Sequence, residues 1–174
     1  MIDPLTLVRF LMREYPLLIR RLQLLKNYVK DNGDKRIAAI ILFGSIARLT
    51  ASPNSDTDLL VLLKINGDRT VERDLSHHFY RVIERAEKAS GNNDASWHIV
   101  PITGDITGND LDADFLAQIG EDGVLLYHRR DTPLPSALRH LTSFVAWQKQ
   151  ATTLVETLEH ALNLADNKQV AAIS

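Results

Sequence analysis

The sequence predicts an α/β (α+β) fold in which helices flank a small mixed β-sheet and a long helical extension follows. Short, largely apolar runs such as residues 37–43 are typical of buried strands. They alternate with longer segments in which apolar residues recur every three or four positions, the period of an amphipathic helix. From this order we expect residues 1–130 to form one domain and residues 131–174 to form a C-terminal helical extension.

The N-terminal part is expected to contain a helix and two strands. Residues 5–30 carry apolar side chains on one helical face, and Pro16 is expected to kink this helix or to start a second one. Turn-forming residues 31–34 end it, and the apolar run 37–43 predicts the first strand. Three segments follow, namely a short helical stretch, a loop and the second strand: residues 45–49, 50–55 and 56–64.

The remaining sequence alternates between helical and strand-like patterns. Residues 66–68 are expected to turn the chain into a charged amphipathic helix at 70–89. The next segments are a loop, the third strand, a helix and a short strand: residues 90–94, 96–102, 111–119 and 123–128. Gly120 is expected to end the helix before it. From Pro133 onwards we expect a long C-terminal helix that frays after Asn167.

Composition excludes several classes of protein. The 174 residues include no cysteine, which excludes disulfides and thiolate metal sites. No apolar run approaches the roughly 18 residues of a membrane span. The N-terminus lacks the basic and apolar blocks of a signal peptide, so the cytoplasm is the simplest compartment. The net charge is −2 and Lys and Arg form no dense run, which argues against a nucleic-acid partner held by phosphate contacts.

The most informative motif is a Gly44-Ser45 turn followed, after residues 46–55, by Asp56 and Asp58. Side chains alternate along a strand, so the two carboxylates face the same way, about 7 Å apart along the backbone. Two anions beside an apolar run repel each other and resist desolvation unless a cation lies between them, and oxygen ligands suit Mg²⁺. A Gly-Ser turn offers N–H groups and a hydroxyl to a phosphate. The motif therefore predicts a site for a metal-bound nucleoside triphosphate.

This motif resembles the signature of the polymerase-β-type nucleotidyltransferase superfamily, in which a Gly followed by Gly or Ser precedes two acids that lie one residue apart. The form at residues 43–63 is similar to the minimal nucleotidyltransferases, which include antitoxins paired with HEPN-domain toxins, and to the kanamycin-type nucleotidyltransferases. A weaker likeness extends to about residue 130. The resemblance implies that residues 1–130 form the nucleotidyltransferase domain.

The resemblance also implies a role for each residue of the motif. Asp56 and Asp58 are expected to bind Mg²⁺ or Mn²⁺. Gly44 and Ser45 are expected to cradle the phosphates of ATP or another nucleoside triphosphate. Arg48 is expected either to contact a phosphate or to form a surface ion pair. Two of these residues have structural alternatives, because Ser45 would also suit a helix cap and Asp56 the cap of a turn.

One departure from the family pattern concerns the third carboxylate, which is expected on a later strand and is replaced here by His98. Two interpretations compete. Imidazole is a poor Mg²⁺ ligand, so the metal that activates the acceptor would be held weakly. Alternatively, His98 serves as general base for the attacking hydroxyl, a task that suits imidazole near neutral pH. A core histidine is the structural alternative, and Asp94 and Asp105 are weaker candidates for the third acid.

These observations support two main functions. The first is Mg²⁺-dependent transfer of a nucleoside monophosphate, foremost AMP from ATP, to a hydroxyl of a protein or small molecule. The second is a catalytically impaired nucleotide-binding or antitoxin-like regulatory module, for which the resemblance implies a HEPN-type toxin as partner. A third hypothesis is an interaction protein without a ligand. The apolar stripes on the terminal helices must be covered, and a homodimer interface is one way to cover them.

Overall fold

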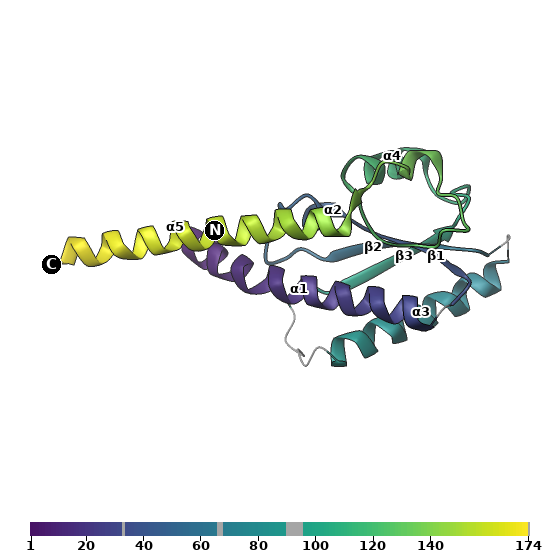
Figure 1. Cartoon of the computed structure of the whole chain (residues 1–174), viewed down its shortest axis with the longest axis horizontal. Helices are drawn as coiled ribbons and strands as arrows, with labels where there is room; N and C mark the ends of the chain where they lie inside the picture. Colours follow the sequence, from purple (N-terminus) through teal and green to yellow (C-terminus); the bar gives the residue numbers. More distant parts are fainter. Residues whose placement is uncertain (33, 66–67, 90–95, 174) are drawn as a thin grey trace.

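The computed structural model describes residues 1–32, 34–65, 68–89 and 96–173, and it confirms the predicted fold class. Helices flank a five-stranded mixed sheet with the strand order β3-β2-β1-β4-β5 (Figure 1). The strands are β1 (Ile37–Phe43), β2 (Thr57–Leu63), β3 (Ile99–Asp105), β4 (Val124–His128) and β5 (Thr142–Ser143). The helices are α1 (Pro4–Asn32), α2 (Gly44–Ala47), α3 (Arg69–Ala89), α4 (Ala113–Asp122), the 3₁₀ helix η1 (Ser136–Leu138) and α5 (Phe144–Ile173).

The sheet is built around β1, which pairs antiparallel with β2 and with β4. β2 pairs parallel with β3, and β4 pairs parallel with β5. Because parallel neighbours need a crossover, α3 carries the chain from the end of β2 back to the start of β3. In the β1–β2 pair Phe43 lies opposite Asp58. The end of β1 and the start of β2 therefore meet at one edge of the sheet, and residues 44–56 connect them there.

Each face of the sheet carries an apolar core. Alternate residues of β1 and β2, such as Ile40 and Val61, belong to a core with α1, α3 and the start of α5. The intervening residues, such as Ile41 and Leu60, pack with α4 and η1 on the opposite face (Figure 1). Because both faces are covered, the two strands are nearly continuous apolar runs, which is why their positions were predictable from the sequence.

Helix α1 runs without a break through Pro16. Proline removes one backbone hydrogen bond, but Tyr15 and Leu18 on either side of it are fully buried and hold the helix against the core. No second helix starts at this position. The predicted turn at 31–34 includes Gly33, which lies outside the described residues, as do residues 66–67 of the next predicted turn.

The third strand and the helix after it differ from the predicted boundaries. β3 starts at Ile99, later than the predicted 96–102, where its parallel register with β2 begins. α4 continues through Gly120 to Asp122, so the expectation that Gly120 ends the helix is wrong. A β-carbon at position 120 would collide with the carbonyl oxygen of Ala137. Gly120 is therefore needed because η1 approaches closely.

The C-terminal helix α5 begins at Phe144, later than the predicted start near Pro133. Leu134 and Leu138, whose spacing suggested an earlier start, pack beside α4 instead. The helix continues to Ile173 rather than fraying after Asn167. Its first turns are anchored by buried residues, whereas its far end projects from the body of the molecule (Figure 1). The division of the chain at residue 130 stays a prediction.

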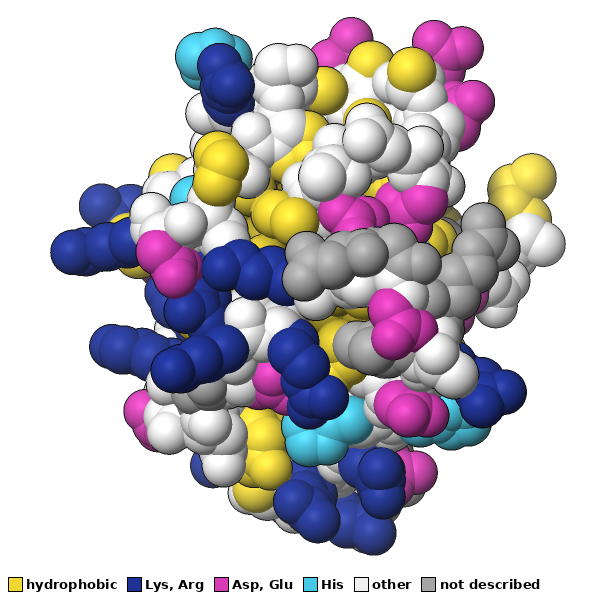
Figure 2. Space-filling model, turned by 90° about the vertical axis from the view of Figure 1, so that its right-hand side faces the viewer, with side chains coloured by type: hydrophobic (Ala, Val, Ile, Leu, Met, Phe, Trp, Pro, Cys, Tyr) yellow, Lys and Arg dark blue, Asp and Glu magenta, His cyan; other side chains and the backbone are white. Residues whose placement is uncertain are grey.

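Charged side chains are mixed at the end of the molecule formed by the loops after β2 and β4. Figure 2 shows many Lys and Arg side chains on this end, with Asp and Glu among them. Asp131 pairs with Arg129 and with Lys64, and Asp34 pairs with Arg36. Among the described helices, none is both long and apolar enough to cross a membrane.

Candidate functional site

The two carboxylates of the motif lie where β2 begins. Thr57 between them is fully buried and faces the α1 side of the sheet, so Asp58 faces the opposite side. Asp56 is exposed, just before the strand, and Asp58 is half-buried. Burial raises the pKa of Asp58 above its ordinary value, the charge of Asp56 raises it further, and the charge of Arg48 partly lowers it. Asp58 is therefore an anion in an unfavourable environment, which an added cation would relieve.

Gly44 lies directly against the carboxylate of Asp58. The backbone of Gly44 has a φ of +79°, in the left-handed region that favours glycine. A β-carbon at position 44 would lie 2.6 Å from Oδ2 of Asp58, closer than any side chain tolerates. The glycine therefore serves two purposes, because it turns the chain from β1 into α2 and admits the carboxylate to the turn.

Ser45 does not cap α2. The N-cap residue is Phe43, which makes no side-chain cap bond. The hydroxyl of Ser45 instead donates to the hydroxyl of Ser55 across 3.1 Å. The carbonyl of Ser45 accepts from the backbone N–H of Thr50 at 2.9 Å. The turn that carries Ser45 is thus bonded to the loop that leads to Asp56.

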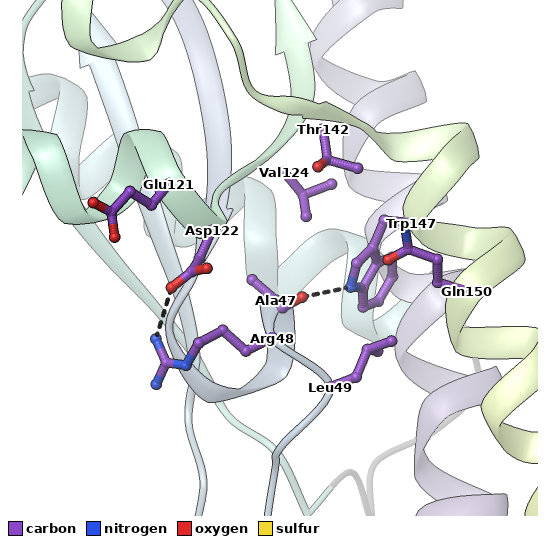
Figure 3. Close-up of a pocket in the computed structure, with 9 residues that line it drawn as sticks. All are labelled: Ala47, Arg48, Leu49, Glu121, Asp122, Val124, Thr142, Trp147 and Gln150. Carbon is purple, nitrogen blue, oxygen red and sulfur yellow. Dashed lines mark hydrogen bonds and ion pairs between the residues drawn. The ribbon is translucent and has the colours of Figure 1, made fainter.

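Arg48 reaches toward acids on two elements. Its charge acts on Asp58, and its Nη1 lies 3.9 Å from Oδ2 of Asp122, the last residue of α4 (Figure 3). Both side chains of the ion pair are about half exposed, so the pair contributes little to stability. The surface ion pair expected for Arg48 is therefore present, and the guanidinium also lies close enough to the carboxylates to act on an anion bound there.

Arg48 and Asp122 separate two hollows of similar size. One, of about 200 Å³, lies toward Gly44 and is lined by Phe43 and Phe115. The other, of about 190 Å³, lies toward Thr142 and α5 and is shown in Figure 3. In this second hollow the indole N–H of Trp147 donates to the Ala47 carbonyl at 3.2 Å. The C-terminal helix is thereby bonded to the last residue of α2.

His98 lies immediately before β3 with an exposed side chain, so it is not a core histidine. Its carbonyl accepts from the backbone N–H of Thr57 at 2.7 Å. In the parallel register Val100 lies beside Asp58, and extending that register by one pair of residues places His98 beside Asp56. The histidine is therefore at the same edge of the sheet as the carboxylates.

No third acid joins the two carboxylates in the part of the chain that the structure describes. Asp105 lies beside Leu63 at the opposite end of β2, which removes it as a candidate. Asp94 lies outside the described residues. Among the described side chains, no three His, Asp or Glu residues gather closely enough to hold a metal ion. The site therefore contains a pair of carboxylates with a neighbouring histidine.

This donor set fits one Mg²⁺ that a nucleotide brings with it. Mg²⁺ is commonly held by one or two carboxylates together with water and substrate phosphates, and it does not need a complete cage of protein ligands. Asp56 and Asp58 would supply the two carboxylates, and burial together with the charge of Asp56 raises the pKa of Asp58 although the charge of Arg48 opposes the shift. A second metal ion that needs a third carboxylate as a ligand would bind more weakly.

Three residues of this site were missed by sequence reasoning. Ser55 lies in the predicted loop 50–55 and Trp147 in the predicted C-terminal helix, and neither position by itself indicates a role at the site. Asp122 carried no local signal, because its pairing with Arg48 depends on how α4 lies over the sheet. The tryptophan did carry one signal, since a buried indole N–H needs an acceptor.

A match to a protein-family model covers the motif residues of this site. The family model described as Polymerase beta, Nucleotidyltransferase matches residues 23–132. No curated protein matches the sequence significantly. The chain is similar to a chain in a crystal structure of a toxin–antitoxin with AMP-PNP, with 14% sequence identity and a TM-score of 0.39. The match covers 83% of the present chain and 94% of the chain in that structure. A mutant of the toxin–antitoxin MntA–HpeT is 12% identical, with coverage of 83% and 93% and a TM-score of 0.37. Structural similarity at this level is too low to transfer a ligand or a partner.

Proposed function

The chain belongs to the polymerase beta nucleotidyltransferase family, and from this premise we propose that it transfers a nucleoside monophosphate from a triphosphate to a hydroxyl group. ATP is the proposed donor and AMP the transferred group. The acceptor is a hydroxyl of a protein or of a small molecule. The bond between the α-phosphorus and the bridging oxygen breaks, a bond from the acceptor oxygen to the α-phosphorus forms, and pyrophosphate leaves with the bridging oxygen.

The motif residues would divide the work of binding. Asp56 and Asp58 would hold Mg²⁺ or Mn²⁺, which neutralises phosphate charge and aligns the attack when bound. Backbone N–H groups at Gly44 and Ser45 would face the β- and γ-phosphates, where a side chain on Gly44 would obstruct the approach. Arg48 would exchange its exposed partner Asp122 for a phosphate, because a charge-assisted bond to a dianion is the stronger contact.

His98 would take the proton of the attacking hydroxyl. Its exposed ring lies at the edge of the sheet where the carboxylates lie, so an acceptor arriving from solvent would meet it. A general base of this kind contributes typically 10²- to 10⁴-fold to the rate. In this proposal the imidazole acts on the acceptor and does not serve as a metal ligand.

The single observation that carries the proposal is the contact between Gly44 and Asp58. It brings a Gly-Ser turn, of the type that can bind phosphate, beside a carboxylate whose pKa is raised by burial and by the neighbouring Asp56. The test is incubation with α-labelled nucleoside triphosphates and Mg²⁺ or Mn²⁺, with and without the protein encoded by the neighbouring gene. We expect label transfer by the wild type and its loss in Asp58→Asn. The matched control Asp74→Asn changes an exposed acid on α3 and should retain transfer.

The absence of a third acid beside Asp58, within the described residues, favours a second candidate function. The register position next to Asp58 is Val100, which cannot bind a metal. A catalytically impaired, antitoxin-like regulatory module would then bind Mg²⁺-ATP without turning it over. This function predicts that Mg²⁺-ATP raises the Tm of the protein while no label is transferred to any acceptor.

A protein partner is compatible with both candidate functions, and a HEPN-type toxin is the partner that the motif resemblance implies. The far half of α5 is relevant because Leu164, Val170 and Ile173 are exposed there by 50%, 68% and 88%. A homodimer is the alternative way to cover these side chains. Measurement of the molecular mass in solution, alone and with the neighbouring gene product, separates the two.

A further inference from the structure

A cluster of three serine hydroxyls bonds the Gly44-Ser45 turn to the strand that carries the carboxylates. The Ser45 hydroxyl donates to the Ser55 hydroxyl at 3.1 Å. The Ser55 hydroxyl also accepts from the backbone N–H of Ser52 at 2.9 Å and lies 3.4 Å from the Ser52 hydroxyl. Ser55 directly precedes Asp56 in the sequence. The bond between Ser45 and Ser55 therefore fixes the Gly44-Ser45 turn to the backbone that leads into the carboxylate pair.

The hydroxyl of Ser55 does more than support the local turn. The backbone N–H of Ser55 already donates to the Ser52 carbonyl at 3.0 Å, and this bond does not involve the side chain. The Ser55 side chain is half-buried and points to the turn ten positions earlier in the sequence. The side chain therefore bonds both to its own turn, through the backbone N–H of Ser52, and to the Gly44-Ser45 turn.

The proton and the two lone pairs of the Ser55 hydroxyl determine which hydrogen bonds it can form in the cluster. A serine hydroxyl has one proton to donate and two lone pairs. The backbone N–H of Ser52 occupies one lone pair of Ser55, which leaves its proton and one lone pair for exchange with the other hydroxyls. If Ser45 gives its proton to a phosphate oxygen, Ser55 donates to Ser45 in return, and the contact between the two oxygens persists.

We propose that Ser55 is a positioning residue that keeps Ser45 aligned with the carboxylate pair before and after a nucleoside triphosphate binds. The role rests on the proposed function, because it concerns the triphosphate site of that function. Ser55 acts through Ser45 and does not itself contact the reacting atoms. Alanine at position 55 would remove the bond from the Ser45 hydroxyl to Ser55 and loosen the spacing between turn and strand.

The test compares three variants of the full chain, Ser55→Ala, Ser55→Thr and Ser52→Ala. Calorimetry measures the Kd for Mg²⁺-ATP, and amide hydrogen exchange at residues 45–48 is measured without nucleotide. We expect Ser55→Ala to raise the Kd for Mg²⁺-ATP by about tenfold, because the variant loses the hydrogen bond that positions Ser45 for the phosphates. Amide exchange in the turn should accelerate in the same variant, with only a small fall in Tm because the backbone N–H of Ser52 also loses its acceptor. Ser55→Thr keeps the hydroxyl and should restore both values.

Ser52→Ala is the matched control, because it removes a hydroxyl from the same cluster and leaves the Ser45–Ser55 bond intact. A Ser55→Ala variant with the wild-type Kd overturns the positioning role, as does a Ser52→Ala variant that is equally impaired. Failure of Ser55→Thr to improve on Ser55→Ala also overturns it. If the wild type itself does not bind Mg²⁺-ATP, the proposed function is refuted and the positioning role with it, so the two failures are distinguishable.

Discussion

The carboxylate of Asp58 lies beside Gly44, at the point where β1 turns into α2, so a β-carbon at position 44 would displace it. The contact follows from the antiparallel register, in which Phe43 pairs with Asp58. It places the start of one strand beside the end of another and brings their polar residues together. The first prediction concerns this contact.

Gly44→Ala should impair both folding and nucleotide binding. The left-handed backbone costs an alanine about 1–2 kcal/mol, and the displaced Asp58 carboxylate would weaken Mg²⁺-ATP binding further. Urea unfolding and calorimetry measure the two effects. Gly108→Ala is the matched control, since Gly108 also has a positive φ, of 73°, but lies away from the site. It should lose stability and keep its affinity for Mg²⁺-ATP, and equal losses of affinity would contradict the role of Gly44.

Asp58→Asn should change the pH dependence of stability while weakening metal binding. The pKa of Asp58 is raised in the folded protein, so the folded state holds the proton more tightly than the unfolded chain does. The tighter proton binding stabilises the folded protein at pH values below the pKa that Asp58 has in the unfolded chain. This stabilisation is lost as the pH rises through the pKa that Asp58 has in the folded protein. Relative to wild type, the variant should therefore gain stability as the pH rises through that window, by less than about 1 kcal/mol because the group is partly solvated.

Asp58→Asn should also bind Mg²⁺-ATP at least about tenfold more weakly. Loss of a residue that only hydrogen-bonds to a metal ligand already lowers metal affinity by about tenfold, and Asp58 is proposed to be a ligand itself. Thermal melts from pH 3 to pH 7 without nucleotide test the first effect, and calorimetry at pH 7 tests the second. A difference in Tm that stays constant across the pH series would show that Asp58 is not perturbed by its surroundings.

His98→Asp should restore the third carboxylate of the family pattern. We expect tighter binding of Mg²⁺-triphosphate, because a carboxylate is the better Mg²⁺ ligand, and slower label transfer, because the proposed imidazole base is removed. His77→Asp introduces the same charge at an exposed position on α3 and serves as control. If neither binding nor transfer changes at position 98, His98 does not line the site.

Trp147→Phe should loosen α2 from the C-terminal helix. Phenylalanine keeps most of the buried ring but removes the N–H that bonds the Ala47 carbonyl, at a cost of about 1 kcal/mol. Denaturant unfolding measures the loss, and hydrogen exchange at residues 44–48 shows whether it is local. Gln150→Ala alters an exposed residue of the same hollow and should be silent. Unchanged exchange in Trp147→Phe would mean that α5 does not brace the turn.

The predicted fold and the family both followed from local patterns. β1 and β2 are buried on both faces, so their apolar runs were continuous and easy to locate. The spacing from Gly44 to Asp58 indicated the family, which the match over residues 23–132 confirms. Errors arose where a residue type has two uses, as with Gly120, whose missing side chain admits η1 instead of ending a helix.

The sequence by itself determined the central strands β1 and β2, the carboxylate pair and the turn before it, because strand periodicity and glycine chemistry depend on neighbours along the chain. Only the tertiary structure decided that Asp122 pairs with Arg48, that Trp147 holds α2, and that Val100 stands beside Asp58. Those contacts depend on how separate elements pack and on strand register. Both are set by burial over the whole core, and no local pattern encodes them.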